Sequence, residues 1–173
     1  MSETPQEYIA RILSYQQGKV PIKILASTSK AMTKLIRGKS AAQLKKRLQP
    51  EKWSVAEIIA HLADTELVFG FRVRLALGQN GVTIQAFDQD AWADFGEYGK
   101  TNAKESLATF TILREHNLRM LKGLPKEMWE NFGMHTERGK ENVTRMSEMF
   151  AGHDLNHLIQ IEKILKRKKQ PQT

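Results

Sequence analysis

Hydrophobic residues recur along most of this chain at the three- and four-residue spacing of amphipathic helices. This pattern predicts three long helices: one from Ser54 to Leu77, one from Thr101 or Asn102 to Gly123, and one that begins at Asn142 or Thr144 and continues past Leu165. A strand would instead alternate polar and apolar positions, and the only candidate, Val82 to Phe87, is short. The pattern therefore predicts an all-α protein.

Shorter helices are expected before the first long one. A capping box from Thr4 to Glu7 begins a helix that Gly18 ends. A second segment runs from Pro21 to Arg37 with a break near residues 27–29, and a third short piece covers Ala41 to Leu48. One of these N-terminal helices supplies the fourth member of a four-helix bundle.

The remaining segments are predicted to connect the helices. Residues 79–100 hold glycines, aspartates and scattered aromatic residues and form a long connection between the second and third bundle helices. Residues 125–130 make one helical turn, and residues 131–141 form a loop. We expect residues 1–173 to form a single domain with a frayed basic tail over residues 166–173.

Charge raises the question of a polyanionic partner, because the formal net charge is +8. The excess lies at the ends: residues 1–49 carry +8, residues 50–162 carry −5, and residues 163–173 carry +5. No zinc-finger spacing, RNA-binding aromatic motif or basic zipper accompanies these ends. Nucleic acid is therefore not the favoured partner, although the basic ends leave binding to an acidic surface open.

Composition excludes several other classes of protein. The chain has no cysteine, so disulfides, thiolate metal sites and a cysteine nucleophile are ruled out. We find neither an apolar stretch of membrane-spanning length nor a basic-then-apolar leader. These features lead us to expect a cytoplasmic protein without a membrane partner.

The sharpest chemical feature is the pair His153 and His157 in the last predicted helix. A spacing of four residues places both imidazoles on one helix face, where they can ligate the same metal ion. The same stripe carries Met146, Phe150 and Ile161, so it faces the interior. A pair of hydrogen-bonded core histidines is the alternative, and the pair alone does not separate the two.

A third histidine favours the metal site. His61 lies on the inward stripe of the first long helix and can meet the pair if the two helices pack together. Three imidazoles with an open coordination position are typical of catalytic Zn²⁺ or Ni²⁺ sites, since structural zinc usually has four protein ligands.

Other polar residues near this stripe are weaker candidates for a catalytic or binding role. Asp64 is our candidate for a general base, and Arg72 for a group that holds a substrate carboxylate, although pairing with Asp88 or Asp90 would also explain Arg72. Glu57 could orient His61, or act only as a capping residue. Of the other histidines, His116 is expected at the surface, and His135 in a loop that could cover the pocket mouth.

Two segments resemble one known family. The stretch from Trp53 to Glu66, WSVAEIIAHLADTE, is similar to the helix-two signature of the DinB/YfiT-like superfamily. The stretch from His153 to Ile161, HDLNHLIQI, resembles the last-helix motif of that family, and His135 with Gly139 is similar to its preceding loop. The similarity extends over roughly residues 18–166.

The resemblance implies a four-helix bundle of unusual handedness, often a homodimer, with metal ligands at His61, His153 and His157. Relatives include transferases that join a low-molecular-weight thiol such as bacillithiol to an electrophile, and others described as metal-dependent hydrolases. We therefore expect a metal-dependent enzyme with a divalent ion and a small-molecule substrate, in the first place a transferase that uses a low-molecular-weight thiol as cofactor and otherwise a related hydrolase. The alternative is a non-catalytic bundle that binds metal structurally or serves only in dimerisation.

Overall fold

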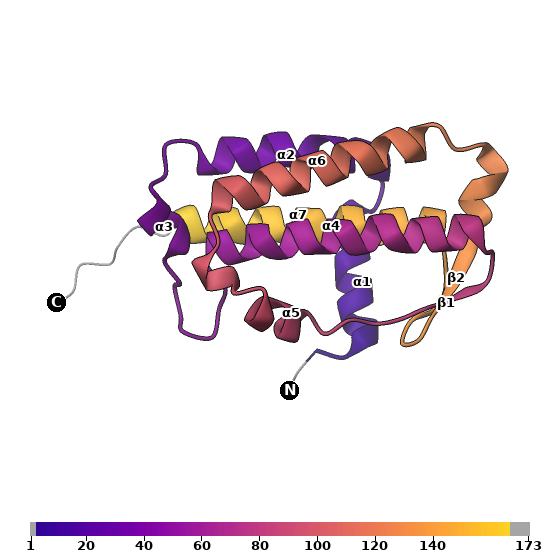
Figure 1. The fold of residues 1–173 in the computed structure, drawn as a ribbon, viewed down its shortest axis with the longest axis horizontal. Helices are drawn as coiled ribbons and strands as arrows, with labels where there is room; N and C mark the ends of the chain where they lie inside the picture. The colour runs from indigo at the N-terminus through magenta and orange to yellow at the C-terminus, as the bar shows by residue number, and fades with distance from the viewer. Residues whose placement is uncertain (1–2, 167–173) are drawn as a thin grey trace.

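The computed structural model of the protein describes residues 3–166. Four long helices form the bundle: α2 (Pro21–Ile36), α4 (Val55–Gly78), α6 (Ala103–Lys122) and α7 (Val143–Lys166). In cross-section α4 packs against α6 and α7, and α2 completes the ring by packing against the same two helices. Figure 1 shows α2 and α6 as one layer and α4 and α7 as the other. The predicted all-α bundle is confirmed.

Smaller elements cover the outside of the bundle. Helix α1 (Pro5–Gln16) crosses the outer face of α7, and α3 (Ala41–Lys45) lies near one end (Figure 1). The capping boxes at Thr4, Ser40 and Ser54 are all formed, so these three helices begin where the sequence predicts. Helix α3 ends at Lys45, three residues before the predicted end.

The predicted break in α2 is wrong. Ser27 Oγ donates to the carbonyl of Ile24 at 2.9 Å, and Thr28 Oγ1 lies 3.0 Å from the same oxygen. The Ser27 hydroxyl thus bonds within the helix instead of competing with it, and the single Thr28 proton is shared between that carbonyl and Asp154 Oδ2 on α7, the nearer acceptor at 2.7 Å. The helix therefore continues without interruption from residue 21 to residue 36.

The two predicted connections are more ordered than expected. Residues 79–100 contain β1 (Val82–Ile84), α5 (Gln89–Phe95) and the 3₁₀ turn η1 (Tyr98–Lys100), while η2 (Lys126–Glu130) is the predicted single turn. The predicted loop at 131–141 is wrong, because β2 (Phe132–His135) and β3 (Gly139–Asn142) form a hairpin. Strand β1 pairs in parallel with β2, so the three strands form a small sheet at one end of the bundle (Figure 1).

A buried polar layer crosses the middle of the bundle between two hydrophobic clusters. Arg114 of α6 is 2% exposed and donates to Glu66 of α4 at 2.9 Å and to Asp154 of α7 at 2.6 Å. Thr28 of α2 contacts the same Asp154 carboxylate. All four bundle helices thus meet in one hydrogen-bonded network, which sets their relative rotation and the direction in which the α7 histidines point.

Candidate metal centre

The three predicted ligands come together in the interior between α4 and α7. Nε2 of His153 lies 3.2 Å from Nε2 of His61 and 3.1 Å from Nε2 of His157. One candidate ligand atom from each ring falls within 4.8 Å of the other two. His61 and His157 are only 2% and 8% exposed. The prediction that His61 lies beside His153 and His157 is therefore confirmed.

These separations fit a tetrahedral ion. With metal–nitrogen bonds of about 2.05 Å, two nitrogens of a tetrahedral zinc site lie about 3.3 Å apart. The observed contacts of His153 are close to that value. When all three imidazoles carry their protons on Nδ1, their Nε2 lone pairs point toward one another, and a cation relieves that repulsion. The donor set therefore suits Zn²⁺ or a similar divalent ion.

Burial keeps the three rings in the neutral form that metal binding requires. Desolvation, with a smaller contribution from the neighbouring His157, lowers the pKa of His61 to about 3. Desolvation likewise lowers the pKa of His157 to about 4 and that of His153 well below its usual value. All three imidazoles are consequently uncharged at neutral pH.

Gln160 and Trp53 support the rings from the side. His157 Nδ1 lies 2.9 Å from Gln160 Oε1, so the ring donates its proton there and leaves the Nε2 lone pair for a metal. The ring of Trp53 packs against His61, with centroids 4.8 Å apart. Gln160 shares the inward stripe of the last helix, but its contact with His157 depends on rotamers that the sequence does not show.

The Nδ1 atoms of His61 and His153, unlike that of His157, have no side chain among the described residues that orients them. Neither Nδ1 atom has a hydrogen-bond partner among residues 3–166, although both are buried. Glu57, the sequence candidate for holding His61, bonds instead to the backbone N–H of Ser54 at 2.7 Å and to the guanidinium of Arg47. Glu57 is thus a capping residue with an ion-pair partner, and its possible role at His61 is not realised.

Asp64 is connected to His61 only indirectly, through the side chains of Tyr98 and Trp53. The hydroxyl of Tyr98 donates to Asp64 Oδ2 at 2.5 Å, and the Tyr98 ring packs against Trp53 with centroids 6.1 Å apart. Trp53 therefore contacts both His61 and the partner of Asp64. The sequence offered no signal for Tyr98, because it belongs to η1 in the long connection.

Arg72 lies further from the centre. It follows His61 by 11 residues on the same helix, a rise of about 16 Å along the axis. Its guanidinium donates to the carbonyl of Gln85 at 2.7 Å and lies over the ring of Phe87. Within residues 3–166 it makes no ion pair with Asp88 or Asp90, and Asp88 instead caps α5.

The two remaining histidines lie outside the cluster. His116 is exposed on α6, as the sequence predicts, with Nδ1 2.9 Å from Arg119. His135 belongs to strand β2 and is 3% exposed, so the expectation of a loop residue is wrong. Its Nδ1 accepts from the backbone N–H of Glu137 at 3.2 Å, and burial, together with Arg138 and Arg72, lowers its pKa to about 4.

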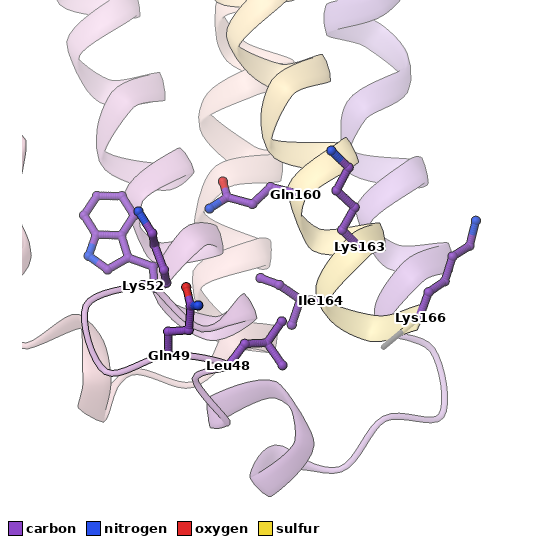
Figure 2. A pocket seen from close by; sticks show the side chains of 8 residues that line it. Leu48, Gln49, Lys52, Gln160, Lys163, Ile164 and Lys166 are labelled. Atoms are coloured by element: carbon purple, nitrogen blue, oxygen red, sulfur yellow. The ribbon is translucent and has the colours of Figure 1, made fainter. Parts of the chain in front are cut away.

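A pocket of about 570 Å³ opens beside the histidines at the α3 end of the bundle. Its walls come from the segment that joins α3 to α4 and from the last turns of α7 (Figure 2). Trp53 and Gln160 belong to this wall and also contact His61 and His157, so the pocket and the histidine cluster are adjacent. The eight lining residues are Leu48, Gln49, Lys52, Trp53, Gln160, Lys163, Ile164 and Lys166.

Comparison with known proteins assigns this chain to a family. Residues 24–161 match the DinB superfamily, which covers most of the chain and includes all three histidines. The protein belongs to the DinB superfamily. The resemblance noted in the two sequence motifs is therefore confirmed.

Individual relatives agree with this assignment. A protein of Oceanobacillus iheyensis named "Putative metal-dependent hydrolase" is 28% identical over 116 residues, which is 67% of each chain. One of the same name from Bacillus cereus is 25% identical over 136 residues, covering 79% of this chain and 78% of the relative. The names of these relatives thus agree with the three-histidine cluster found in this chain.

A solved structure has the same fold. YfiT from Bacillus subtilis, described as "a probable metal-dependent hydrolase with an unusual four-helix bundle topology", aligns with a TM-score of 0.78. The alignment covers 94% of this chain and 88% of YfiT at 17% sequence identity. At that identity the similarity establishes the bundle topology, and the chemistry rests on the residues of this chain.

Within residues 3–166 no helix is both long and apolar enough to cross a membrane. Of the predicted frayed basic tail over residues 166–173, Lys166 is the last residue of α7, and residues 167–173 lie outside the described residues.

Proposed function

We propose that this protein is a metal-dependent hydrolase of small molecules whose divalent ion is held by His61, His153 and His157. The observation that carries this proposal is the meeting of three imidazoles, with Nε2 of His153 3.2 Å from that of His61 and 3.1 Å from that of His157, separations that suit one tetrahedral ion. When bound, such an ion lowers the pKa of a water ligand and polarises a carbonyl or similar group. The names of the relatives support the same class of reaction.

The residues around the histidines have defined tasks in this proposal. Gln160 holds the proton of His157 at Nδ1 and so keeps the ligating nitrogen free. Trp53 covers His61 and limits access of bulk water on that side. Asp64 Oδ2, which accepts the Tyr98 hydroxyl, is the proposed proton acceptor during the reaction.

Metal analysis tests the ligand set directly. Purified protein should contain about one equivalent of divalent metal, and the His61→Ala and His153→Ala variants should lose most of it, because two imidazoles bind far more weakly than three. His116→Ala removes an exposed histidine and serves as the matched control. Unchanged metal content in both ligand variants would contradict the site.

Activity assays distinguish the hydrolase from its alternatives. Metal-loaded protein should hydrolyse members of a panel of carboxylic esters and amides, and Asp64→Asn should lower kcat at unchanged metal content. Thiol transfer is the second candidate, since the family resemblance implies it and a cysteine-free protein must take its thiol from a cofactor. Bacillithiol with 1-chloro-2,4-dinitrobenzene tests that reaction. Bound metal without either activity would favour the non-catalytic bundle.

Assembly and location remain predictions of the family resemblance and the sequence. We expect a homodimer, which analytical ultracentrifugation measures, and a cytoplasmic protein, which cell fractionation measures.

A further inference from the structure

The pocket beside the histidines combines an apolar wall with a cationic rim. Leu48, Trp53 and Ile164 supply the apolar surface, and Figure 2 shows the side chain of Ile164 among the other lining groups. Lys52 comes from the α3–α4 connection, and Lys163 comes from α7, on the other side of the opening. The rim therefore carries positive charge contributed by two separate elements.

These two lysines are available to a ligand. Lys166 forms an ion pair with Glu162 at 2.6 Å, one turn earlier on α7. In the described part of the chain, neither Lys52 nor Lys163 has a carboxylate within 4.0 Å, and both side chains are exposed. Among residues 3–166, no acidic side chain lines the pocket. An anion that entered the pocket would therefore be attracted by the two lysines of the rim and would meet no carboxylate among the lining side chains.

The position of the pocket connects this rim with the metal centre. Gln160 projects into the pocket from α7 in Figure 2, and its Oε1 is the partner of His157. Trp53 lines the pocket and covers His61. A molecule whose apolar body rests on Trp53 and Ile164 would consequently place one end near the histidines and the other near Lys52 and Lys163.

We propose that this pocket is the substrate subsite of the three-histidine centre and selects amphipathic anions, with the apolar body against Trp53 and Ile164 and a carboxylate between Lys52 and Lys163. This inference rests on the proposed function, because it assigns the substrate class of the same site. The volume of about 570 Å³ is in the range of small-molecule pockets.

Binding of a matched pair of probes tests the charge selection. The anion 3-(4-nitrophenyl)propanoate and its neutral amide have nearly the same shape, and calorimetric titration gives the affinity of the zinc-loaded protein for each. We expect the anion to bind about tenfold more tightly than the amide, since two exposed charge contacts contribute roughly that much. Equal affinities, or no binding of either probe, would overturn the proposal.

Lysine variants locate the source of the preference. In Lys52→Gln/Lys163→Gln the advantage of the anion should disappear while the affinity for the amide stays within about twofold. Lys104→Gln/Lys122→Gln removes two exposed lysines of α6 outside the pocket and should keep the full preference. Because both double variants lower the net charge equally, a loss in both would mean general electrostatic attraction and would overturn the subsite.

Removing the metal separates this inference from the proposed function. The same titrations on chelator-treated protein should retain the preference for the anion, because the lysines provide it. A preference that survives the pocket variant but vanishes without zinc would show that the carboxylate binds the metal, which would overturn the inference and leave the metal site intact. Failure to bind zinc, with the lysine-dependent preference preserved, would instead overturn the proposed function.

A fluorescence measurement reports where the probe binds. In a Trp92→Phe/Trp129→Phe background Trp53 is the sole tryptophan, and the nitrophenyl group should quench its emission with the calorimetric affinity. Absence of quenching at saturating probe would place the ligand elsewhere and overturn the proposal.

Discussion

At the scale of single residues, the properties of the site depend on groups that contact the histidines rather than on the histidines alone. His157 receives its orientation and its tautomer from Gln160, and His61 is covered by Trp53. Removal of a residue that orients a metal ligand commonly lowers metal affinity by about 10- to 100-fold.

Gln160→Leu should therefore weaken zinc binding about tenfold, because the His157 ring loses the acceptor that fixes its Nδ1 proton. Competition with a chromophoric chelator measures the affinity. Gln160→Glu keeps an acceptor oxygen and should retain most of the affinity, while Gln49→Leu changes a glutamine of the same pocket that makes no histidine contact. Equal zinc affinity in Gln160→Leu and wild type would contradict the role of Gln160.

At the scale of elements, the placement of α1 on α7 depends on a glycine. A Cβ atom on Gly152 would lie 2.1 Å from the carbonyl oxygen of Ile12 and 3.0 Å from its side chain. The backbones of the two helices are therefore in direct contact one residue before His153. Any side chain at position 152 must push α1 away from α7.

Gly152→Ala should consequently destabilise the protein by about 1–3 kcal/mol, the usual cost of overpacking. Urea unfolding followed by circular dichroism measures the free energy of unfolding. Gly78→Ala is the matched control, because a Cβ there meets nothing within 4 Å, and helix propensity favours alanine by up to about 1 kcal/mol. Equal stability of Gly152→Ala and wild type would mean that α1 can shift on α7 at little cost.

At the scale of the whole molecule, the polar layer joins the four bundle helices. Arg114 is buried with two carboxylates, and removal of one partner from a buried ion pair typically costs about 3–5 kcal/mol. Arg114→Met should thus lower the free energy of unfolding by about that amount, because Glu66 and Asp154 remain buried without a cation.

The triple variant Arg114→Met/Glu66→Gln/Asp154→Asn provides the control for charge. It removes the stranded carboxylates and should recover part of the loss in the same unfolding measurement. A triple variant as unstable as Arg114→Met would show that packing, and not uncompensated charge, determines the cost.

Metal binding should also stabilise the whole molecule, because the three ligands come from α4 and α7 and meet only in the folded state. Zinc at 100 times its dissociation constant would add about 2.7 kcal/mol, which corresponds to a rise in Tm of roughly 5–10 °C for a chain of this size. Differential scanning calorimetry before and after chelation measures this difference, and His61→Ala should show almost none. An unchanged Tm in the wild type would contradict a metal site formed by folding.

The features that sequence analysis predicted correctly are those that depend on neighbours within one or two helical turns. Capping boxes, amphipathic stripes and the four-residue spacing of His153 and His157 are local, so the helix starts and the orientation of the pair follow from the residues themselves. The family motifs extended this to His61, since they also imply which helices pack together.

The features that were missed depend on contacts between distant segments. Strand β1 pairs with β2 about 50 residues later in the chain, so neither strand has a strong pattern of its own. The side chain of Ile84 packs against Gly133, where a Cβ atom would lie only 2.2 Å from Ile84 Cδ1. The continuity of α2 near Thr28, the Arg114 network and the approach of Tyr98 to Asp64 likewise arise from tertiary packing. Local residue chemistry thus specifies the helices and the candidate ligands. The surroundings that orient these histidines and shape the adjacent pocket form only when the helices pack, because their energies come from partners remote in the chain.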